Sequence, residues 1–253
     1  MIYDIQKASM WRRLSSFLLD IILIAVLATG FALFVAWVTN YDKYQEKLSD
    51  YYLQYEEEYG LKVSMKKTDY DELSEEDQNR YLQMVEDMNN NQDLLYCYNM
   101  TINLMLVIIS GGVFLSVLIL EFFVPLIFKN GQTIGKKVFS TGVIKINGVK
   151  TSKIQLFVRA ILGKYAIEIM LPILLIILLL AGTIGYIGMI LLVGLVIFQL
   201  MLVSMSKNHQ AIHDVLAYTV VVDLQTQMIF DNEDELLEYK KQNHLIEIKS
   251  TKD

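Results

Sequence analysis

Asp20, Glu121 and Glu168 are the side chains of this sequence best placed to do chemistry, because each interrupts a long run of apolar residues. A carboxylate inside such a run is costly and by default indicates a functional site. At about 1.5 Å of helical rise per residue, each lies within a few turns of a basic flank. We therefore expect all three carboxylates in the same half of a bilayer.

Nearby basic side chains decide whether such carboxylates stay charged. An isolated carboxylate in apolar surroundings has a raised pKa and becomes neutral, whereas a neighbouring cation keeps it ionised. Two interpretations stay open: an ion-pair network that fixes helix packing, or a site for a cation, a proton or an anionic group. In either case we expect an intramembrane polar cluster, open to the cytoplasm and formed by Arg12, Arg13, Asp20, Glu121, Arg159, Glu168, His213 and Asp214.

His213 and Asp214 follow the last apolar run of the chain. An adjacent histidine and aspartate could relay protons there, because imidazole titrates near physiological pH. The alternative is that the pair caps a helix end and orients a following strand, which we expect over residues 219–222.

The sequence does not predict an enzyme. Residues 131–137 are one residue too short between their glycines for a phosphate-binding loop, and Lys137 stands where Ser or Thr would bind magnesium. The sequence contains no zinc-ligand set, and no serine and histidine are expected at one membrane depth. We therefore expect no catalytic reaction, no cofactor, no bound metal and no nucleic-acid partner.

The elements that must position the cluster are membrane helices. The chain is 54% hydrophobic with only two prolines, so its apolar residues form runs long enough to cross the hydrocarbon core. Residues 14–38 and 101–128 each predict one span, and the run 165–203 is broken near 181–186 into two. A signal peptide is the competing interpretation of the first run, but that run is too long.

Charge predicts the orientation of these spans. Residues 129–164 hold eight Lys or Arg and no acidic residue, whereas residues 39–100 hold six Lys or Arg and fifteen Asp or Glu. Basic loops stay in the cytoplasm. We expect a multi-pass protein of the cell membrane with both termini in the cytoplasm.

The acidic segment 39–100 predicts helices, since Ser74 and Asp77 fit a capping box at a helix start. One helix is expected from Tyr44 to Tyr59 and another from Ser74 to about Asp87, after which three asparagines, Asn89 to Asn91, should loosen the chain. The segment is either a solvated spacer or a docking surface for a protein partner.

The basic segment predicts a β-hairpin, because Asn147-Gly148 is a common two-residue turn and lies between 138–146 and 149–152. Residues 153–164 then predict a short basic amphipathic helix in the head-group plane, in contact with anionic lipid. A charged helix, capped by Asp231 or Asn232, is expected over 231–241 in the tail.

The expected fold class is an all-α membrane protein with four transmembrane helices, an extracytoplasmic helical insertion and a small cytoplasmic β-hairpin. In chain order we expect a first span with its inner flank (8–38), the acidic insertion (39–100), a second span (101–128), the basic cytoplasmic loop (129–164), a third and fourth span (165–205) and a cytoplasmic tail (206–253).

The order of several short motifs resembles the RDD family of bacterial integral membrane proteins. The motifs are Ala8–Arg13 leading to Asp20, Glu121 ahead of Gly131–Lys136, Arg159, and His213–Thr219. The arginine and two aspartates that give this family its name match Arg13 (or Arg12), Asp20 and Asp214. The insertion is longer than the family's usual outer connection, and family members commonly have fewer than four clear spans.

The resemblance implies a small ion or solute transporter related to sodium or proton exchange, or a membrane subunit of one. A chain this short with no internal repeat would act as an oligomer. The alternative is a membrane scaffold or accessory protein that binds a partner through its acidic insertion. The outer halves of the spans contain no ionisable residue, so no charged pathway crosses the membrane.

Overall fold

The computed structural model describes residues 4–128 and 130–250, with side chains to residue 242. Lys129, the first residue of the expected basic loop, lies outside this part. Within it, four helices are long and apolar enough to cross a membrane, as predicted: Met10–Val38 (α1), Gln92–Phe128, Lys153–Leu180 and Gly185–Met205 (α10).

The chain divides into two compact units, and the boundary runs through two of these helices. Unit 1 comprises residues 1–28 and 113–253, and unit 2 comprises residues 29–112. Unit 1 contains all eight residues expected in the polar cluster.

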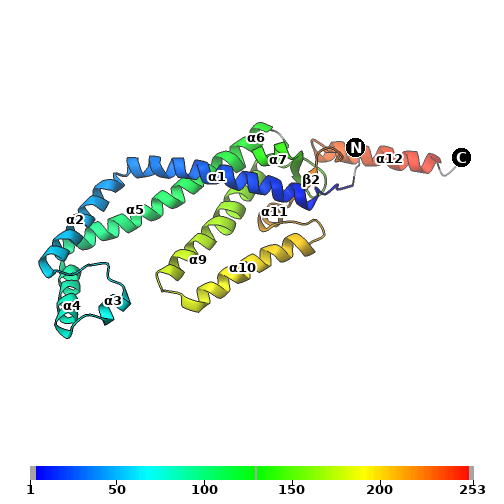
Figure 1. Cartoon of the computed structure of the whole chain (residues 1–253). Helices are drawn as coiled ribbons and strands as arrows, with labels where there is room; N and C mark the ends of the chain where they lie inside the picture. Colours follow the sequence, from blue (N-terminus) through cyan, green and yellow to red (C-terminus); the bar gives the residue numbers. More distant parts are fainter. Residues whose placement is uncertain (1–3, 129, 251–253) are drawn as a thin grey trace. The chain divides into compact units, whose positions relative to one another are not determined.

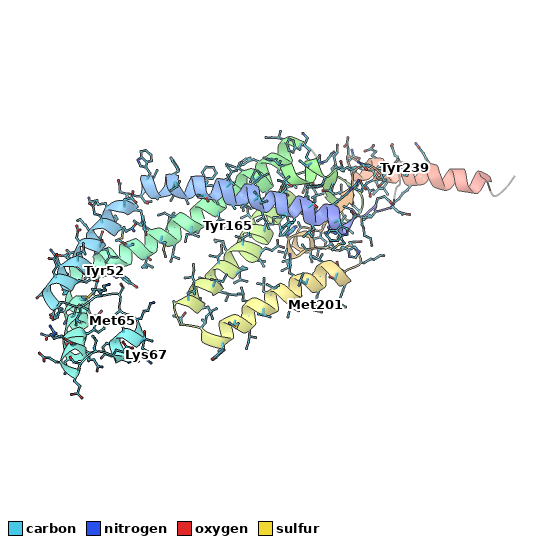
Figure 2. All side chains as sticks on the ribbon, viewed as in Figure 1. Tyr52, Met65, Lys67, Tyr165, Met201 and Tyr239 are labelled. Carbon is cyan, nitrogen blue, oxygen red and sulfur yellow. The ribbon has the colours of Figure 1, made fainter. Side chains whose placement is uncertain are left out.

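Unit 2 contains the acidic segment, which is helical. Its helices are α2 (Tyr41–Tyr59), α3 (Lys67–Asp71), α4 (Glu75–Asn90) and the first part of α5 (Gln92–Val117). Ser74 caps α4, because its hydroxyl oxygen accepts a hydrogen bond from the Asp77 backbone N–H. Figure 2 labels Tyr52 of α2 and Lys67 of α3 in this part of the chain.

The expected loose segment Asn89–Asn91 is reduced to a break at Asn91, between α4 and α5. The α4 helix continues through Asn90, and the Asn91 side chain accepts hydrogen bonds from the backbone N–H groups of Asp93 and Leu94. Asn91 therefore caps the next helix, so the second membrane helix begins at Gln92 and not at the expected residue 101.

The second and third membrane helices each contain a stretch of wider, π-helical turns in unit 1. In the second, η1 (Leu118–Phe123) is followed by α6 (Val124–Phe128). In the third, α8 (Lys153–Phe157), η2 (Val158–Met170) and α9 (Leu171–Leu180) form one continuous helix. The expected separate amphipathic helix over 153–164 is therefore the first part of a membrane helix, and it buries Arg159 and Lys164.

The α9 and α10 helices form the predicted hairpin. They pack side by side and are joined by a short turn that contains Gly182 at φ 70° (Figure 1). Met201 on α10 is half exposed, as are many apolar side chains of this helix (Figure 2). Such a surface suits contact with lipid.

A two-stranded antiparallel sheet joins distant parts of unit 1. Strand β1 (Thr141–Lys145) pairs with β2 (Thr219–Asp223), with Val143 opposite Val221. The expected hairpin at Asn147-Gly148 is reduced to its turn and one bridge between Ile144 and Lys150. The apolar run Val220–Val222 is the better partner for β1, because it buries three valines against it.

Three further helices belong to the described part of unit 1. They are α7 (Ile134–Val138), α11 (Ile212–Leu216) and α12 (Glu233–Ser250). Asn232 caps α12 by accepting the backbone N–H of Glu235 at 2.8 Å. The apolar core between the membrane helices of this unit centres on Ile24, Val117, Leu120 and Ala160.

Candidate functional site: a buried cluster of charges

The two π-helical segments carry four of the charged side chains of the site. Glu121 lies in η1, and Arg159, Lys164 and Glu168 lie in η2. Wider turns are frequent at functional sites, because they redirect side chains that a regular helix would spread around its axis.

Asp214 lies at the centre of the largest group of contacts. Its Oδ1 pairs with Arg159 Nη1 and accepts a hydrogen bond from Thr219 Oγ1, and its Oδ2 accepts the Ala211 backbone N–H at 3.2 Å. Arg13 Nη2 approaches Oδ2 to 3.7 Å. Burial opposes the charged form, but the Arg159 guanidinium prevails and lowers the pKa of Asp214 below its ordinary value.

His213 lies between a carboxylate and a guanidinium. Its Nδ1 is 2.8 Å from both carboxylate oxygens of Glu168, and its Nε2 is 2.9 Å from Arg159 Nη2. Burial lowers the pKa of His213, although the Glu168 charge opposes this. The helix around Arg159 can approach α11 because residue 163 is glycine: a Cβ there would lie 2.4 Å from the His213 Cβ.

Glu168 is held by uncharged donors. The His213 backbone N–H and Gln199 Nε2 each donate to its Oε1 at 3.1 Å, in addition to the imidazole contact. Gln199 comes from α10 and also accepts the Ile212 backbone N–H. These bonds fix α10, η2 and α11 to one another.

Asp20 ties α1 to the short helix α7. Its carboxylate accepts hydrogen bonds from Thr133 Oγ1 at 2.5 Å and the Gly135 N–H at 2.8 Å, and it lies 3.5 Å from Lys136 Nζ. A Cβ at Gly135 would lie 2.3 Å from the Ser16 carbonyl oxygen, so only glycine allows this approach.

The remaining carboxylate, Glu121, pairs with Lys164. Lys136 is buried nearby, and its pKa is lowered first by burial and then by the charge of Lys164. We use the term charge cluster for the nine residues joined in this way, namely Arg13, Asp20, Glu121, Lys136, Arg159, Lys164, Glu168, His213 and Asp214.

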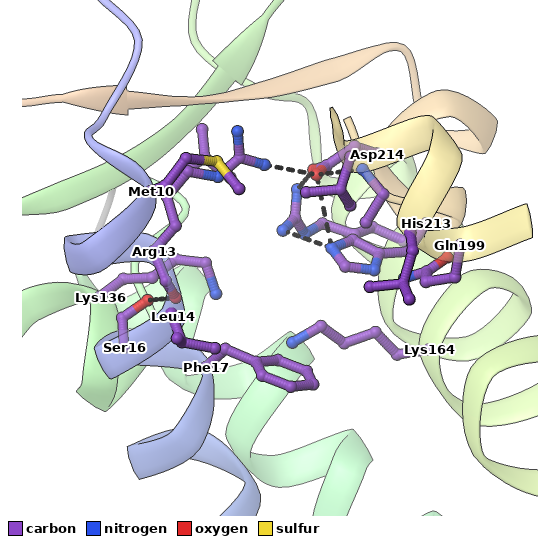
Figure 3. Close-up of a pocket in the computed structure, with 15 residues that line it drawn as sticks. Met10, Arg13, Leu14, Ser16, Phe17, Lys136, Lys164, Gln199, His213 and Asp214 are labelled. Carbon is purple, nitrogen blue, oxygen red and sulfur yellow. Dashed lines mark hydrogen bonds and ion pairs between the residues drawn. The ribbon is translucent and has the colours of Figure 1, made fainter. Parts of the chain in front are cut away.

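A pocket of about 250 Å³ lies beside the charge cluster, between the start of α1 and the end of α10. Figure 3 shows Arg13, Lys136, Lys164 and Asp214 around it, together with the apolar side chains of Leu14 and Phe17. Among residues 4–128 and 130–242, no three His, Cys, Asp or Glu side chains are grouped so that they could hold a metal ion.

These contacts join side chains from the start of α1, from η1, from α7, from η2 and from α11. The sequence motifs described above occur in the same order along the chain. The RDD family model matches residues 7–218, which is most of the chain. The chain belongs to the RDD family. No curated protein and no solved structure matches it.

The structure places seven of the eight expected residues of this RDD protein in the charge cluster. Arg12 is the exception. It pairs with Asp223 at 2.7 Å and with Gln225, near solvent, because it faces β2 and not the cluster.

The expected cluster lacked three contributors to the site of this RDD protein, namely Lys136, Lys164 and Gln199. Lys136 ends the Gly131–Lys136 motif of the resemblance, but neither that motif nor the rejected phosphate loop predicts its contact with Asp20. Gln199 had a clear signal, since it is the one amide side chain in the otherwise apolar helix Gly185–Met205. An isolated polar residue in a membrane helix indicates an interhelical hydrogen bond.

Proposed function

We propose that this RDD protein is a multi-pass protein of the cell membrane with both termini in the cytoplasm and its acidic segment outside. The support is the charge asymmetry between residues 129–164 and 39–100, because basic loops are retained on the cytoplasmic side. Cysteines introduced singly near Lys150 and near Glu57, in a chain with Cys97→Ser, would test this. A membrane-impermeant thiol reagent should label the second and not the first in intact cells.

We further propose that the protein is a small ion transporter of the sodium/proton-exchange type, or the membrane subunit of one, with no catalytic reaction. The observation that carries this is the environment of Glu168. Asp20, Glu121 and Asp214 each pair with a lysine or arginine, whereas the hydrogen-bond donors of Glu168 are His213 and Gln199. Among the described residues, Glu168 forms no direct ion pair with a lysine or arginine, although the charge of Lys164 acts on it from farther away. A carboxylate without such a direct pair can gain free energy by taking up a proton or a sodium ion.

Transport across the whole bilayer would require an oligomer. Residues 169–206 contain no Asp, Glu, Lys, Arg or His, so the half of these helices remote from the charge cluster offers no charged site. We propose that a second copy of the chain, or another membrane subunit, completes the pathway.

Ion flux in proteoliposomes tests the transport proposal. We expect a sodium gradient to drive a pH change with the wild-type protein, and expect Glu168→Gln to abolish it. Glu86→Gln is the matched control, because Glu86 is exposed in α4, outside the charge cluster. Absence of flux with well-folded wild-type protein, reconstituted at oligomer-forming density, would refute transport by this chain alone.

A scaffold or accessory role is the second candidate, and the acidic segment favours it. The α2 helix buries none of its residues although it carries six tyrosines, so its surface is open to a partner. We expect deletion of residues 43–90 to remove an associated protein from crosslinked, affinity-purified samples while the membrane helices remain folded. An unchanged set of crosslinked proteins would contradict this role.

A further inference from the structure

The pocket beside the charge cluster has a cationic wall. Arg13, Lys136, Arg159 and Lys164 line it, and Asp214 is the acidic side chain that reaches it. The carboxylates of Asp20 and Glu121 pair with the lysines from outside the pocket lining. The space itself therefore faces more positive than negative charge.

One of these cations has a free donor. Arg13 Nη1 is buried and has no hydrogen-bond partner among the described residues, and the Arg13 side chain as a whole is 11% exposed. Its other terminal nitrogen, Nη2, lies 3.7 Å from Asp214, too far for a hydrogen bond. A buried guanidinium N–H without an acceptor is costly, so an anionic oxygen at this position would be strongly favoured.

The two lysines of the pocket favour an anion as well. Lys136 and Lys164 come from different segments, yet they are close enough that the charge of Lys164 lowers the pKa of Lys136. A negative charge in the pocket would offset this repulsion.

The opposite wall of the pocket is apolar and open. Leu14, Phe17 and Leu200 line the pocket and also remain 46%, 45% and 60% exposed. They belong to two membrane helices, so this wall continues into the surface that faces the acyl chains. A ligand with an anionic head and an apolar tail matches both walls.

We propose that this pocket binds an anionic phospholipid, with a phosphate oxygen accepting from Arg13 Nη1 and the acyl chains lying along α1 and α10. The volume of about 250 Å³ is space for several water molecules, far less than a whole phospholipid needs. It therefore suits a phosphate and part of its glycerol, with the chains outside. Basic pockets between membrane helices on the cytoplasmic side are a known type of lipid site.

The proposal does not depend on ion transport. Lipid binding is measured on the purified protein without a gradient, so failure of the flux experiment would leave it intact. Conversely, a protein that exchanges ions but shows no lipid preference would refute only the lipid site.

The test is native mass spectrometry of the full chain in detergent, titrated with phosphatidylglycerol or with phosphatidylcholine of identical acyl chains. We expect phosphatidylglycerol to bind several-fold more tightly. Arg13→Gln should weaken its binding by roughly tenfold, the effect of losing one charge-assisted hydrogen bond. Arg12→Gln is the matched control, because the Arg12 guanidinium pairs with Asp223 and does not line the pocket. This variant should bind phosphatidylglycerol like the wild type.

Two further variants test the lipid site if Arg13→Gln is unstable. If Arg13→Gln fails to fold, Arg13→Lys retains the charge and should bind more weakly than the wild type, and Phe17→Ala should weaken lipid binding through the apolar wall. Equal binding of the two lipids, or equal loss in the Arg12 and Arg13 variants, would overturn the proposal. Displacement of phosphatidylglycerol by equimolar inorganic phosphate would also overturn it and identify a free-phosphate site.

Discussion

His213 Nε2 lies 2.9 Å from Arg159 Nη2, and this contact decides where the imidazole holds its proton. A guanidinium has donors but no acceptor, so Nε2 must accept. The proton of neutral His213 is therefore on Nδ1, directed at the Glu168 carboxylate. A second proton on the imidazole would sit on Nε2 and would point at an N–H group of Arg159, so two donors would face each other.

Stability should consequently decrease as the pH falls. The folded-state pKa of His213 is lowered by burial, so the folded protein binds this proton less readily than the unfolded chain. Neutral His213 contributes fully to stability above its pKa in the unfolded chain, which is about 6.5. This contribution is lost as the pH falls from that value through the lower pKa of His213 in the folded protein. We expect a lower thermal unfolding temperature in detergent at pH 5 than at pH 7.5.

The comparison variant for the pH experiment is His213→Gln. Its side chain does not titrate in this range, so its unfolding temperature should vary less between pH 7.5 and 5 than that of the wild type. The lowered pKa of Asp214 adds a loss of the same sign, but at more acidic pH. Identical pH dependence in the two proteins would show that His213 is not the titrating group.

Two arginine–aspartate pairs in unit 1 should differ strongly in their effect on stability. Asp214→Ala leaves the buried Arg159 and Arg13 guanidinium groups without their carboxylate, and we expect a loss of about 3–5 kcal/mol in the free energy of unfolding. Asp223→Ala removes the more exposed partner of Arg12 and should cost about 0–1 kcal/mol. Chemical denaturation of both variants would measure the difference, and similar losses would contradict the assigned burial.

Glycine substitutions test the close approach of η2 to α11. Gly163→Ala would place a Cβ 2.4 Å from the His213 Cβ and 2.6 Å from its Cα. The His213 Cα is a backbone atom and cannot rotate away, so η2 and α11 must separate. We expect this to cost about 1–3 kcal/mol in the free energy of unfolding. Gly194→Ala, on α10 with nothing within 4 Å of the new Cβ, should be neutral or stabilising. Thermal unfolding of both variants is the measurement.

The helix cap at Ser74 should act locally. Ser74→Ala removes the acceptor for the Asp77 backbone N–H, which costs about 1 kcal/mol at a helix start. Because Ser74 lies in unit 2, we expect faster amide hydrogen exchange in the first turns of α4 and unchanged exchange around Asp214. Faster exchange in both regions would contradict the division into two units.

Local chemistry explains why much of the fold is predictable from the sequence. The four membrane helices follow from the length of the apolar runs, and the cap at Ser74 follows from side-chain and backbone groups only three residues apart. The carboxylates of the site were identifiable for the same reason, since an acidic residue stands out in an apolar run.

The pairing within the site depends on contacts between distant residues. Asp20 and Lys136 are separated by 116 positions, and Arg159 and Asp214 by 55. The β1 strand likewise pairs with β2 and not with residues 149–152, which follow it in the sequence. The reason is that β2 buries three valines in this pairing. Local propensity cannot rank such alternatives.

The sequence by itself therefore determined the membrane class, the number of spans and the types of charge available to the cluster. Only the tertiary structure decided that Arg13 and not Arg12 faces Asp214, and that the segment 153–164 enters a membrane helix. Adjacent residues point in different directions on a helix, and which direction becomes buried is set by the packing of α1 against η2, α7 and α11. That packing is a property of the whole unit, and no short stretch of the chain contains it.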